Sequence, residues 1–295
     1  MKYVTISDLG KTIRNNFWKI PHDVDFVIGI PRSGVICASI ISEFLNVPLI
    51  DIDSFVFGAK PTGGGRLRYY NNRHTDEQLK KKKVLVVDDT VWIGNSKKKA
   101  KKQLEPFTDK YDFIYMAVYL EGPGINAIDL YLEDLRKYTN GYKEPVLYEW
   151  NIFHHNEETM ANCIYDIDGV LCVNPPDERN EEEYQKYIKN AVPLFTPTVK
   201  IGEILTYRLV KNEETTKKWL KEHGIEYGKL SMFNAQTWDE RNEKGVPSEL
   251  LKGVYYKNSE WAKLFVESDD FQARKIFEIS GKPVYCVESN KMYSK

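Results

Sequence analysis

Two adjacent aspartates, Asp88 and Asp89, follow an apolar run at residues 84–87 and precede a short loop of small and hydroxyl residues. The run is rich in β-branched residues and lacks polar alternation, so it predicts a buried parallel strand. In open α/β sheets, ligands bind at the carboxyl ends of the strands, and the loop into the next helix offers free backbone N–H groups to a phosphate. Because carboxylates also accept hydrogen bonds from vicinal hydroxyls, the stretch predicts a site for a phosphate and a polyol.

The loop after the aspartates has the residue types that phosphate binding requires. Thr90 and Ser96 supply hydroxyl donors, Gly94 allows close backbone approach, and the following helix N-terminus favours negative charge. The candidate phosphate-binding residues are therefore Thr90, Val91, Trp92, Ile93, Gly94, Asn95 and Ser96.

A second loop upstream, residues 29–34 (GIPRSG), follows a predicted strand and precedes a predicted helix. Its Arg32 and Ser33 suit a second anion. A simpler interpretation is that the aspartate pair only caps a helix, because Asp favours helix N-termini. Capping needs one residue, however, and explains neither this loop nor the long polar segment at residues 57–79.

Together these motifs resemble the signature of the type I phosphoribosyltransferases, which use phosphoribosyl pyrophosphate (PRPP), over about residues 20–140. The resemblance implies that Asp88 and Asp89 hold the ribose hydroxyls and that residues 90–96 hold the 5-phosphate. It further implies that Arg32 and Ser33 meet the pyrophosphate and that residues 57–79 form a mobile hood. Mg²⁺ would bridge the pyrophosphate and ribose oxygens, keeping most of its ligands from water and substrate.

Two positions in the 5-phosphate loop depart from the family pattern. In purine-salvage relatives this loop carries an acid that receives the proton of the base, whereas this chain has Trp92, followed by Ile93 in place of the usual threonine. A nucleobase acceptor is therefore disfavoured, and a sugar hydroxyl is favoured. Trp92 is interpreted either as a stacking platform for a sugar or as a packing residue.

A second motif, YDIDGVL, places Asp166 and Asp168 two residues apart after a short apolar run, with a glycine that allows a tight turn. One carboxylate can attack a phosphate, and the other can protonate the leaving alcohol and later activate water. A calcium-like turn is the alternative. The motif resembles the haloacid-dehalogenase (HAD) phosphohydrolases, which implies that Asp166 is the nucleophile and Asp168 the acid/base.

The HAD resemblance also assigns residues further along the chain. It implies that Thr206 holds the phosphoryl oxygens and that Lys257 offsets transition-state charge, with Lys263 a weaker candidate. The acidic cluster Glu267, Asp269 and Asp270 would complete a Mg²⁺ site, which is needed because a carboxylate and a phosphate dianion repel each other. The predicted metal ligands are Asp166, Asp168, Glu267 and Asp269. Residues 173–197 and 231–256 are interpreted as insertions, the first too short for a large cap.

Helices and strands are predicted to alternate through both halves of the chain, which indicates an α/β fold with a parallel sheet. We expect two domains: a phosphoribosyltransferase fold at residues 1–150 and, after a linker at residues 151–160, a HAD-like Rossmannoid domain with a small cap at residues 161–295. Strands are predicted at residues 25–30, 48–53, 84–87, 112–120, 201–205, 264–266 and 284–287. Helices are predicted at residues 8–20, 213–223 and 271–280, after Gly34 and after Ser96.

The composition narrows the class of protein. The 295 residues carry 42 Lys and Arg against 43 Asp and Glu, a net charge of -1 that gives no support to nucleic-acid binding. Four scattered cysteines suggest reduced thiols. No signal-peptide pattern begins the chain, and no apolar run approaches the ~20 residues that a membrane helix needs. We expect a cytoplasmic enzyme with no membrane span, and a homodimer is left open.

The two resemblances together predict a bifunctional enzyme. One domain would add 5-phosphoribosyl from PRPP to a glycan hydroxyl and the other would remove the 5-phosphate, as in the enzyme pairs that install ribofuranose in bacterial polysaccharides. One alternative is nucleobase salvage coupled to a 5′-nucleotidase. Another is a PRPP-sensing regulator that does not react.

Overall fold

The apolar run before Asp88 and Asp89 belongs to a long strand, β4 (Lys82–Val91), inside a parallel sheet. The strand order is β3-β2-β4-β5-β6, and all of these neighbours pair in parallel. β4 runs through both aspartates and ends at Val91, so it extends beyond the predicted end at residue 87. The aspartates therefore lie at the carboxyl-terminal edge of the sheet, flanked by β2 and β5.

The computed structural model describes residues 1–65, 81–176 and 180–295. It divides the chain into two units, Lys2–Trp150 and Asn151–Lys295 with Met1. The predicted hood, residues 57–79, lies largely outside the described residues, since residues 66–80 are not among them.

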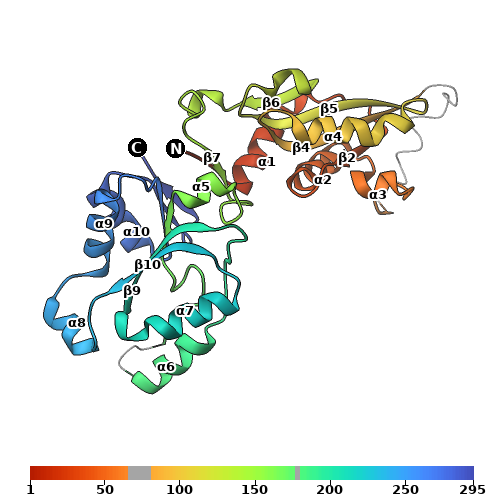
Figure 1. The fold of residues 1–295 in the computed structure, drawn as a ribbon. Helices are drawn as coiled ribbons and strands as arrows, with labels where there is room; N and C mark the ends of the chain where they lie inside the picture. The colour runs from red at the N-terminus through yellow and green to blue at the C-terminus, as the bar shows by residue number, and fades with distance from the viewer. Residues whose placement is uncertain (66–80, 177–179) are drawn as a thin grey trace. The chain divides into compact units, whose positions relative to one another are not determined.

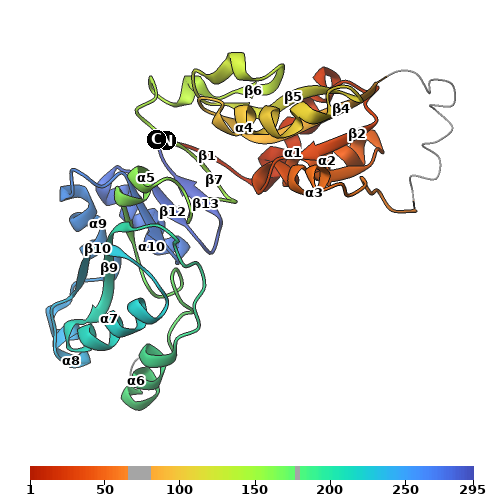
Figure 2. The same cartoon turned by 45° about the vertical axis from the view of Figure 1, so that its right-hand side comes forward.

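The N-terminal unit carries the first sheet and a small parallel pair, β1 with β7 (Figure 2). Its strands are β1 (Lys2–Val4), β2 (Phe26–Gly29), β3 (Leu49–Asp51), β4 (Lys82–Val91), β5 (Tyr111–Leu120), β6 (Leu130–Asp134) and β7 (Val146–Tyr148). Its helices are α1 (Ile6–Asn15), α2 (Ser33–Leu45), α3 (Ile52–Val56) and α4 (Asn95–Leu104), with short 3₁₀ turns between elements. The amphipathic segment at residues 128–138 contains β6.

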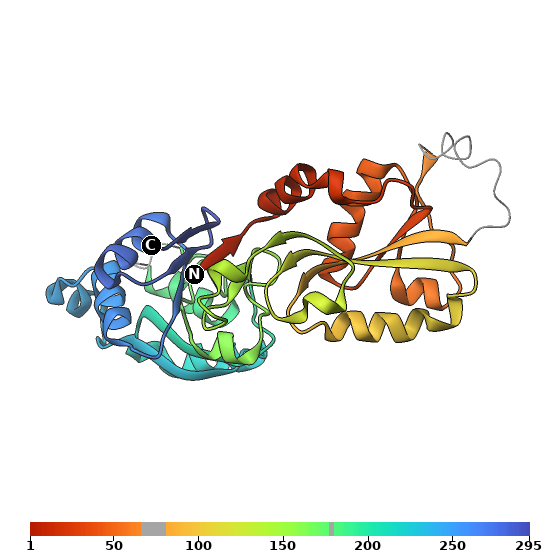
Figure 3. The ribbon, with the colours of Figure 1, turned by 90° about the horizontal axis from the view of Figure 1, so that it is seen from above.

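Alternate residues of β4 pack against helices on opposite faces of this sheet. Leu85 and Val87 belong to one core with residues of α1 and α2, whereas Val84 and Val86 belong to another with residues of α3 and α4. Figure 3 shows α1 and α2 on one side of the strands and α4 on the other. Because both faces are covered, the strand has no polar alternation, which is the pattern that the sequence displays.

The C-terminal unit is built on a sheet of strand order β10-β9-β8-β11-β12-β13, parallel except for the β12–β13 pair. Its strands are β8 (Cys163–Tyr165), β9 (Ile201–Leu209), β10 (Tyr227–Phe233), β11 (Leu264–Glu267), β12 (Val284–Cys286) and β13 (Lys291–Tyr293). Its helices are α5 (Glu157–Ala161), α6 (Glu181–Asn190), α7 (Glu213–Glu222), α8 (Trp238–Lys244), α9 (Ser248–Asn258) and α10 (Asp270–Ser280).

Three adjacent parallel strands of this second sheet carry the polar residues of the DxDG motif and its predicted partners. Asp166 follows β8, Thr206 lies in β9 and Glu267 ends β11. Helices α9 and α10 pack side by side (Figure 1) and contribute Tyr256 and Ile276 to one core with residues of these strands. The predicted α/β fold with a parallel sheet is confirmed. Within the described residues, no helix is long and apolar enough to cross a membrane.

Candidate active sites

The side chains of Asp88 and Asp89 are almost fully buried, at 7% and 8% exposure, and each is held by specific partners. Lys97 of α4 forms an ion pair with Asp88, with 2.9 Å between Nζ and Oδ2. The indole Nε1 of Trp150 donates a hydrogen bond to Asp89 Oδ2 at 2.8 Å, and the backbone N–H of Thr90 donates to Asp89 Oδ1. The two carboxylates are thus fixed in orientation at the sheet edge.

Burial and mutual repulsion shape the charge of this pair. Burial, together with the charge of Asp88, raises the pKa of Asp89 to about 6, and the Trp150 hydrogen bond opposes that rise. Burial also lowers the pKa of Lys97, against the attraction of Asp88. A ligand whose hydroxyl groups donate hydrogen bonds to Asp89 would therefore stabilise the ionised form of this carboxylate.

The loop after the aspartates surrounds a small hollow. Its volume is about 180 Å³, and it is lined by Asp88, by residues 90–96 and by Lys97. Gly94 has a φ of 83°, a left-handed conformation that favours glycine, and it precedes the first residue of α4, Asn95. The structure thus brings the predicted 5-phosphate residues together at a helix N-terminus, where the dipole favours an anion.

The second predicted loop meets the same edge of the sheet. α2 begins at Ser33, and Gly34 packs directly on β4: a Cβ atom at residue 34 would lie 2.6 Å from the carbonyl oxygen of Val87 and 2.9 Å from Asp88 Cα. Only glycine allows this approach without displacement of backbone. The side chain of Arg32 is exposed, next to this contact in the chain.

Trp92 is half-exposed, with 42% of its surface accessible. One part of its ring covers Gly122, where a Cβ atom would lie 2.8 Å from Trp92 Cδ2, and the ring of Tyr142 contacts it edge-on at 5.1 Å. The adjacent Ile93 is also exposed. An aromatic surface therefore borders the hollow.

Residues 4–118 match the family model described as the phosphoribosyl transferase domain. These residues form a PRPP-dependent phosphoribosyltransferase domain. The prediction for the first half of the chain is confirmed at this level, and phosphoribosyl transfer from PRPP is the activity that the match supports.

Solved structures of phosphoribosyltransferases are similar to part of the chain. The xanthine-guanine-hypoxanthine phosphoribosyltransferase of Helicobacter pylori is 15% identical, with a TM-score of 0.36, over 51% of this chain and 93% of that one. The purine phosphoribosyltransferase of Pyrococcus horikoshii is 20% identical, with a TM-score of 0.34, over 50% and 92%. The orotate phosphoribosyltransferase of Aeropyrum pernix is 18% identical, with a TM-score of 0.32, over 46% and 75%. A comparison with curated proteins finds no match.

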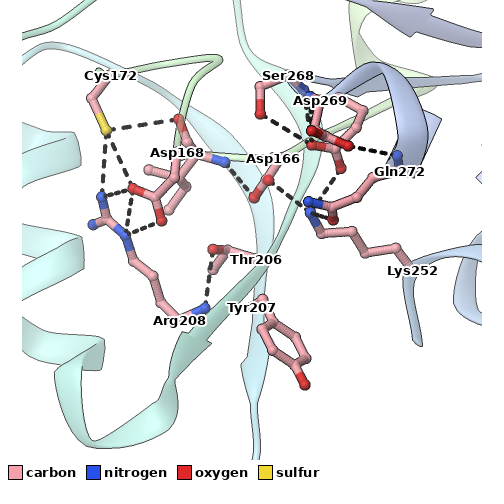
Figure 4. A network of polar contacts seen from close by, with 12 residues as sticks. Asp166, Asp168, Cys172, Thr206, Tyr207, Arg208, Lys252, Ser268, Asp269 and Gln272 are labelled. Carbon is pink, nitrogen blue, oxygen red and sulfur yellow. Dashed lines mark hydrogen bonds and ion pairs between the residues drawn. The ribbon is translucent and has the colours of Figure 1, made fainter. Parts of the chain in front are cut away.

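Beyond the phosphoribosyltransferase domain, the C-terminal unit contains a buried cluster of three charged side chains (Figure 4). The ammonium of Lys252 on α9 donates to Asp166 Oδ2 and to Glu267 Oε2, each at 2.7 Å. Lys252 and Glu267 are 1% and 0% exposed. The backbone N–H groups of Ile167 and Ser268 donate to the remaining oxygens of Asp166 and Glu267.

This cluster has a strongly perturbed charge balance. Burial, with the nearby charges of Glu267 and Asp168, raises the pKa of Asp166 to about 7, although Lys252 works in the opposite direction. Burial tends to lower the pKa of Lys252, but the two carboxylates outweigh it and hold that pKa above its usual range. A buried carboxyl group with a pKa near neutrality is typical of a functional site.

The position of the lysine differs from the prediction. Lys257 is exposed near the end of α9, and Lys252 lies against Asp166 instead. Lys252 and Tyr256, four residues apart, share the buried face of α9. Lys257, the residue after Tyr256, is exposed to solvent. The sequence signal that was missed is a lysine on the apolar stripe of an amphipathic helix.

Asp168 is held by residues that the sequence analysis did not single out. Arg208 donates from Nε and Nη2 to both carboxylate oxygens at 2.6–3.2 Å, and the hydroxyl of Tyr187 donates to Oδ1 at 2.5 Å. Burial tends to raise the pKa of Asp168, but the charge and hydrogen bonds of Arg208 outweigh it, so the pKa lies below its usual value. Arg208 is itself buried, next to Cys172 Sγ.

Thr206 lies between Asp166 and Arg208 in Figure 4, and its hydroxyl accepts a hydrogen bond from the backbone N–H of Arg208 at 3.2 Å. Gly169 has a φ of 73°, and a Cβ there would lie 2.6 Å from the side chains of Asn174 and Ser268. The DxDG turn is therefore packed tightly against Ser268, which directly follows Glu267.

The predicted magnesium ligands do not converge in the C-terminal unit. Lys252 occupies the space between Asp166 and Glu267, Arg208 engages Asp168, and Asp269 accepts from the backbone of Gln272 as the N-cap of α10. Within the part of the chain that the structure describes, no three His, Cys, Asp or Glu residues are grouped to hold a metal. Three of the four predicted ligands, Asp166, Asp168 and Glu267, are thus paired with cationic side chains, and the metal site stays a prediction.

Proposed function

We propose that the chain is bifunctional: it transfers 5-phosphoribosyl from PRPP to a glycan hydroxyl, and its C-terminal unit hydrolyses the 5-phosphate. The observation that carries the proposal is the buried cluster of Asp166, Lys252 and Glu267 on a second α/β unit. The transferase leaves a phosphate on its product. A phosphatase in the same chain is therefore useful when the required product is an unphosphorylated ribofuranoside. The ribofuranosyl residue would enter a bacterial polysaccharide, and the active chain could be a homodimer.

In the transfer step, Asp88 and Asp89 would accept hydrogen bonds from the ribose hydroxyls, and residues 90–96 would bind the 5-phosphate. Arg32 and Ser33 would meet the pyrophosphate. Phosphoribosyltransferases generally use Mg²⁺ to bind PRPP. Asp88 already pairs with Lys97, and Asp89 with Trp150, so the ion would be held by PRPP oxygens and water and would neutralise charge on the leaving pyrophosphate.

The identity of the acceptor is argued from Trp92. This residue offers no proton acceptor for a base, and its half-exposed ring beside Tyr142 suits contact with the apolar face of a sugar. A hydroxyl acceptor therefore fits the loop better than a nucleobase does.

In the hydrolysis step, Asp166 would attack the phosphorus and Asp168 would act as acid and then base. Lys252, in place of Lys257, would hold Asp166 in position and offset charge on the phosphoryl group, and Thr206 would bind a phosphoryl oxygen. Asp166 directly follows β8, and Thr206 lies in the neighbouring parallel strand β9, so the two residues lie close together (Figure 4). We assign no step to a metal, because the carboxylates proposed as ligands are paired with Lys252 and Arg208.

The test is incubation of the protein with PRPP, Mg²⁺ and either methyl glycosides or free nucleobases, with pyrophosphate and inorganic phosphate measured separately. We expect glycoside-dependent release of both. Asp166→Asn should still release pyrophosphate but should accumulate a phosphorylated product, whereas Asp239→Asn, at an exposed residue of α8, should behave as the wild type. Rapid consumption of a free base would overturn the glycan acceptor in favour of salvage. Tight PRPP binding without turnover would indicate a regulator.

A further inference from the structure

Glu121 directly follows β5 at the edge of the sheet where Asp88 and Asp89 lie. β4 and β5 pair in parallel up to Val91 and Leu120, and the backbone N–H of Glu121 donates to the carbonyl of Val91 at 3.0 Å. The carboxyl group therefore belongs to the ligand edge of the phosphoribosyltransferase domain.

A chain of contacts connects Glu121 to Asp89. The hydroxyl of Tyr148 donates a hydrogen bond to Glu121 Oε1, the rings of Tyr148 and Trp150 lie 4.8 Å apart, and Trp150 donates to Asp89. Tyr148 is buried, so its hydroxyl has a fixed direction. Tyr148 therefore orients Glu121, and its ring neighbour Trp150 orients the candidate ribose-binding acid Asp89.

The other side of Glu121 adjoins the aromatic surface. Gly122 lies beneath the ring of Trp92, and the backbone N–H of Gly124 donates to the carbonyl of Trp92 at 2.7 Å. An acceptor that stacks on the ring of Trp92 would thus lie near Glu121, which directly precedes Gly122. Two consecutive residues thus contact the two sides: Glu121 accepts a hydrogen bond from Tyr148, and Gly122 contacts the ring of Trp92.

We infer that Glu121 is the general base of the transfer step, taking the proton of the acceptor hydroxyl. The inference rests on the proposed function. The acceptor O–H bond breaks as its oxygen bonds to C1 of the ribose, and the bond from C1 to the pyrophosphate oxygen breaks with its electron pair leaving on pyrophosphate. The proton is transferred to a carboxylate oxygen of Glu121.

The charge state of Glu121 suits this role. Burial, with the charge of Asp89, raises the pKa of Glu121 to about 7, and the hydrogen bond from Tyr148 opposes the rise. Tyr148 on β7 and Asp89 on β4 are the titratable groups that act on it. A general base is most effective when its pKa lies near the working pH.

The test uses the full chain with PRPP, Mg²⁺ and the methyl glycosides that serve as hydroxyl acceptors in the assay above. In Glu121→Gln we expect the rate of pyrophosphate release to fall at least about 100-fold, because general-base catalysis typically accelerates a reaction by this factor. The affinity for PRPP should change less than about threefold. Glu149→Gln is the matched control, since Glu149 accepts a hydrogen bond from Ile6 N and should retain the wild-type rate.

Tyr148→Phe separates a catalytic from a structural role. Loss of a hydrogen bond that favours the carboxylate should raise the pKa of Glu121, so the rate, which in the wild type increases as pH rises through about 7, should increase only at higher pH. An unchanged rate in Glu121→Gln or an unshifted profile in Tyr148→Phe would overturn the inference, whereas a wild type that binds PRPP but leaves it intact would indicate a regulator. A wild type that fails to bind PRPP would instead overturn the proposed function.

Discussion

The indole of Trp150 donates a hydrogen bond to the carboxylate of Asp89, 61 residues earlier in the chain, at 2.8 Å. Asp89 lies near the carboxyl end of a central strand, β4, whereas Trp150 is the last residue of the N-terminal unit. The closing segment of this unit therefore contributes directly to the candidate ribose site, beyond the residues 4–118 that match the family model.

Trp150→Phe should weaken PRPP binding in a pH-dependent way. The hydrogen bond from Trp150 lowers the pKa of Asp89, so its loss should raise that pKa above about 6 and leave more of the carboxyl protonated near neutrality. We expect about three- to tenfold weaker binding at pH 6.5 and a smaller loss at pH 8.5, measured by calorimetry. Trp18→Phe, at a largely exposed tryptophan, is the control and should bind normally. An equal loss at both pH values would contradict an effect through ionisation of Asp89.

Lys252→Met should abolish phosphatase activity, whereas Lys257→Met should leave it intact. Removing Lys252 leaves Asp166 and Glu267 buried without their shared cation, which costs on the order of 3–5 kcal/mol of stability and favours the protonated, non-nucleophilic form of Asp166. Hydrolysis of p-nitrophenyl phosphate and thermal melting would measure the two effects.

The double variant Lys252→Met with Glu267→Gln guards against simple unfolding, because it removes one of the buried negative charges. It should melt closer to the wild type than the single variant and remain inactive. Full activity in a folded Lys252→Met protein would exclude Lys252 from the hydrolysis step.

Arg208→Met should bring the ionisation of Asp168 into the measurable pH range. In the wild type, the charge of Arg208 outweighs the effect of burial and keeps the pKa of Asp168 low, so phosphate release should show no titration of this group between pH 5 and 8. Without the guanidinium, burial should raise the pKa of Asp168, and the step in which Asp168 acts as base should slow by up to about tenfold for each pH unit below that new pKa. Arg274→Met removes an exposed pair with Glu278 and a contact with the ring of Phe271, and should leave the profile unchanged.

The sequence predicted the residues whose signal is local, and it missed those that come from distant parts of the chain. Asp88 and Asp89 could be found because an apolar run, an acid pair and a glycine loop are contiguous. Lys252 could not, because it lies 86 residues from Asp166 and its role depends on which face of α9 is buried. In the same way, Trp150 reaches Asp89 only through the pairing of β1 with β7, a long-range contact with no pattern of its own.

Asp89→Asn should stabilise the N-terminal unit while abolishing transfer and sparing phosphate hydrolysis. The folded-state pKa of Asp89, about 6, lies above its ordinary value of 3.8, so the folded protein holds the proton more tightly than the unfolded chain does. The resulting contribution to stability is full below about pH 4 and is lost as pH rises toward 6, so the ionised carboxylate destabilises the protein at neutral pH. A neutral amide, which can still accept from Trp150, should remove a penalty on the order of 2 kcal/mol at pH 7.5 and almost none at pH 4. Calorimetric melting at the two pH values measures the difference, with the exposed Asp112→Asn as control. A variant no more stable than the wild type at pH 7.5 would contradict the prediction that the ionised carboxylate of Asp89 destabilises the folded protein.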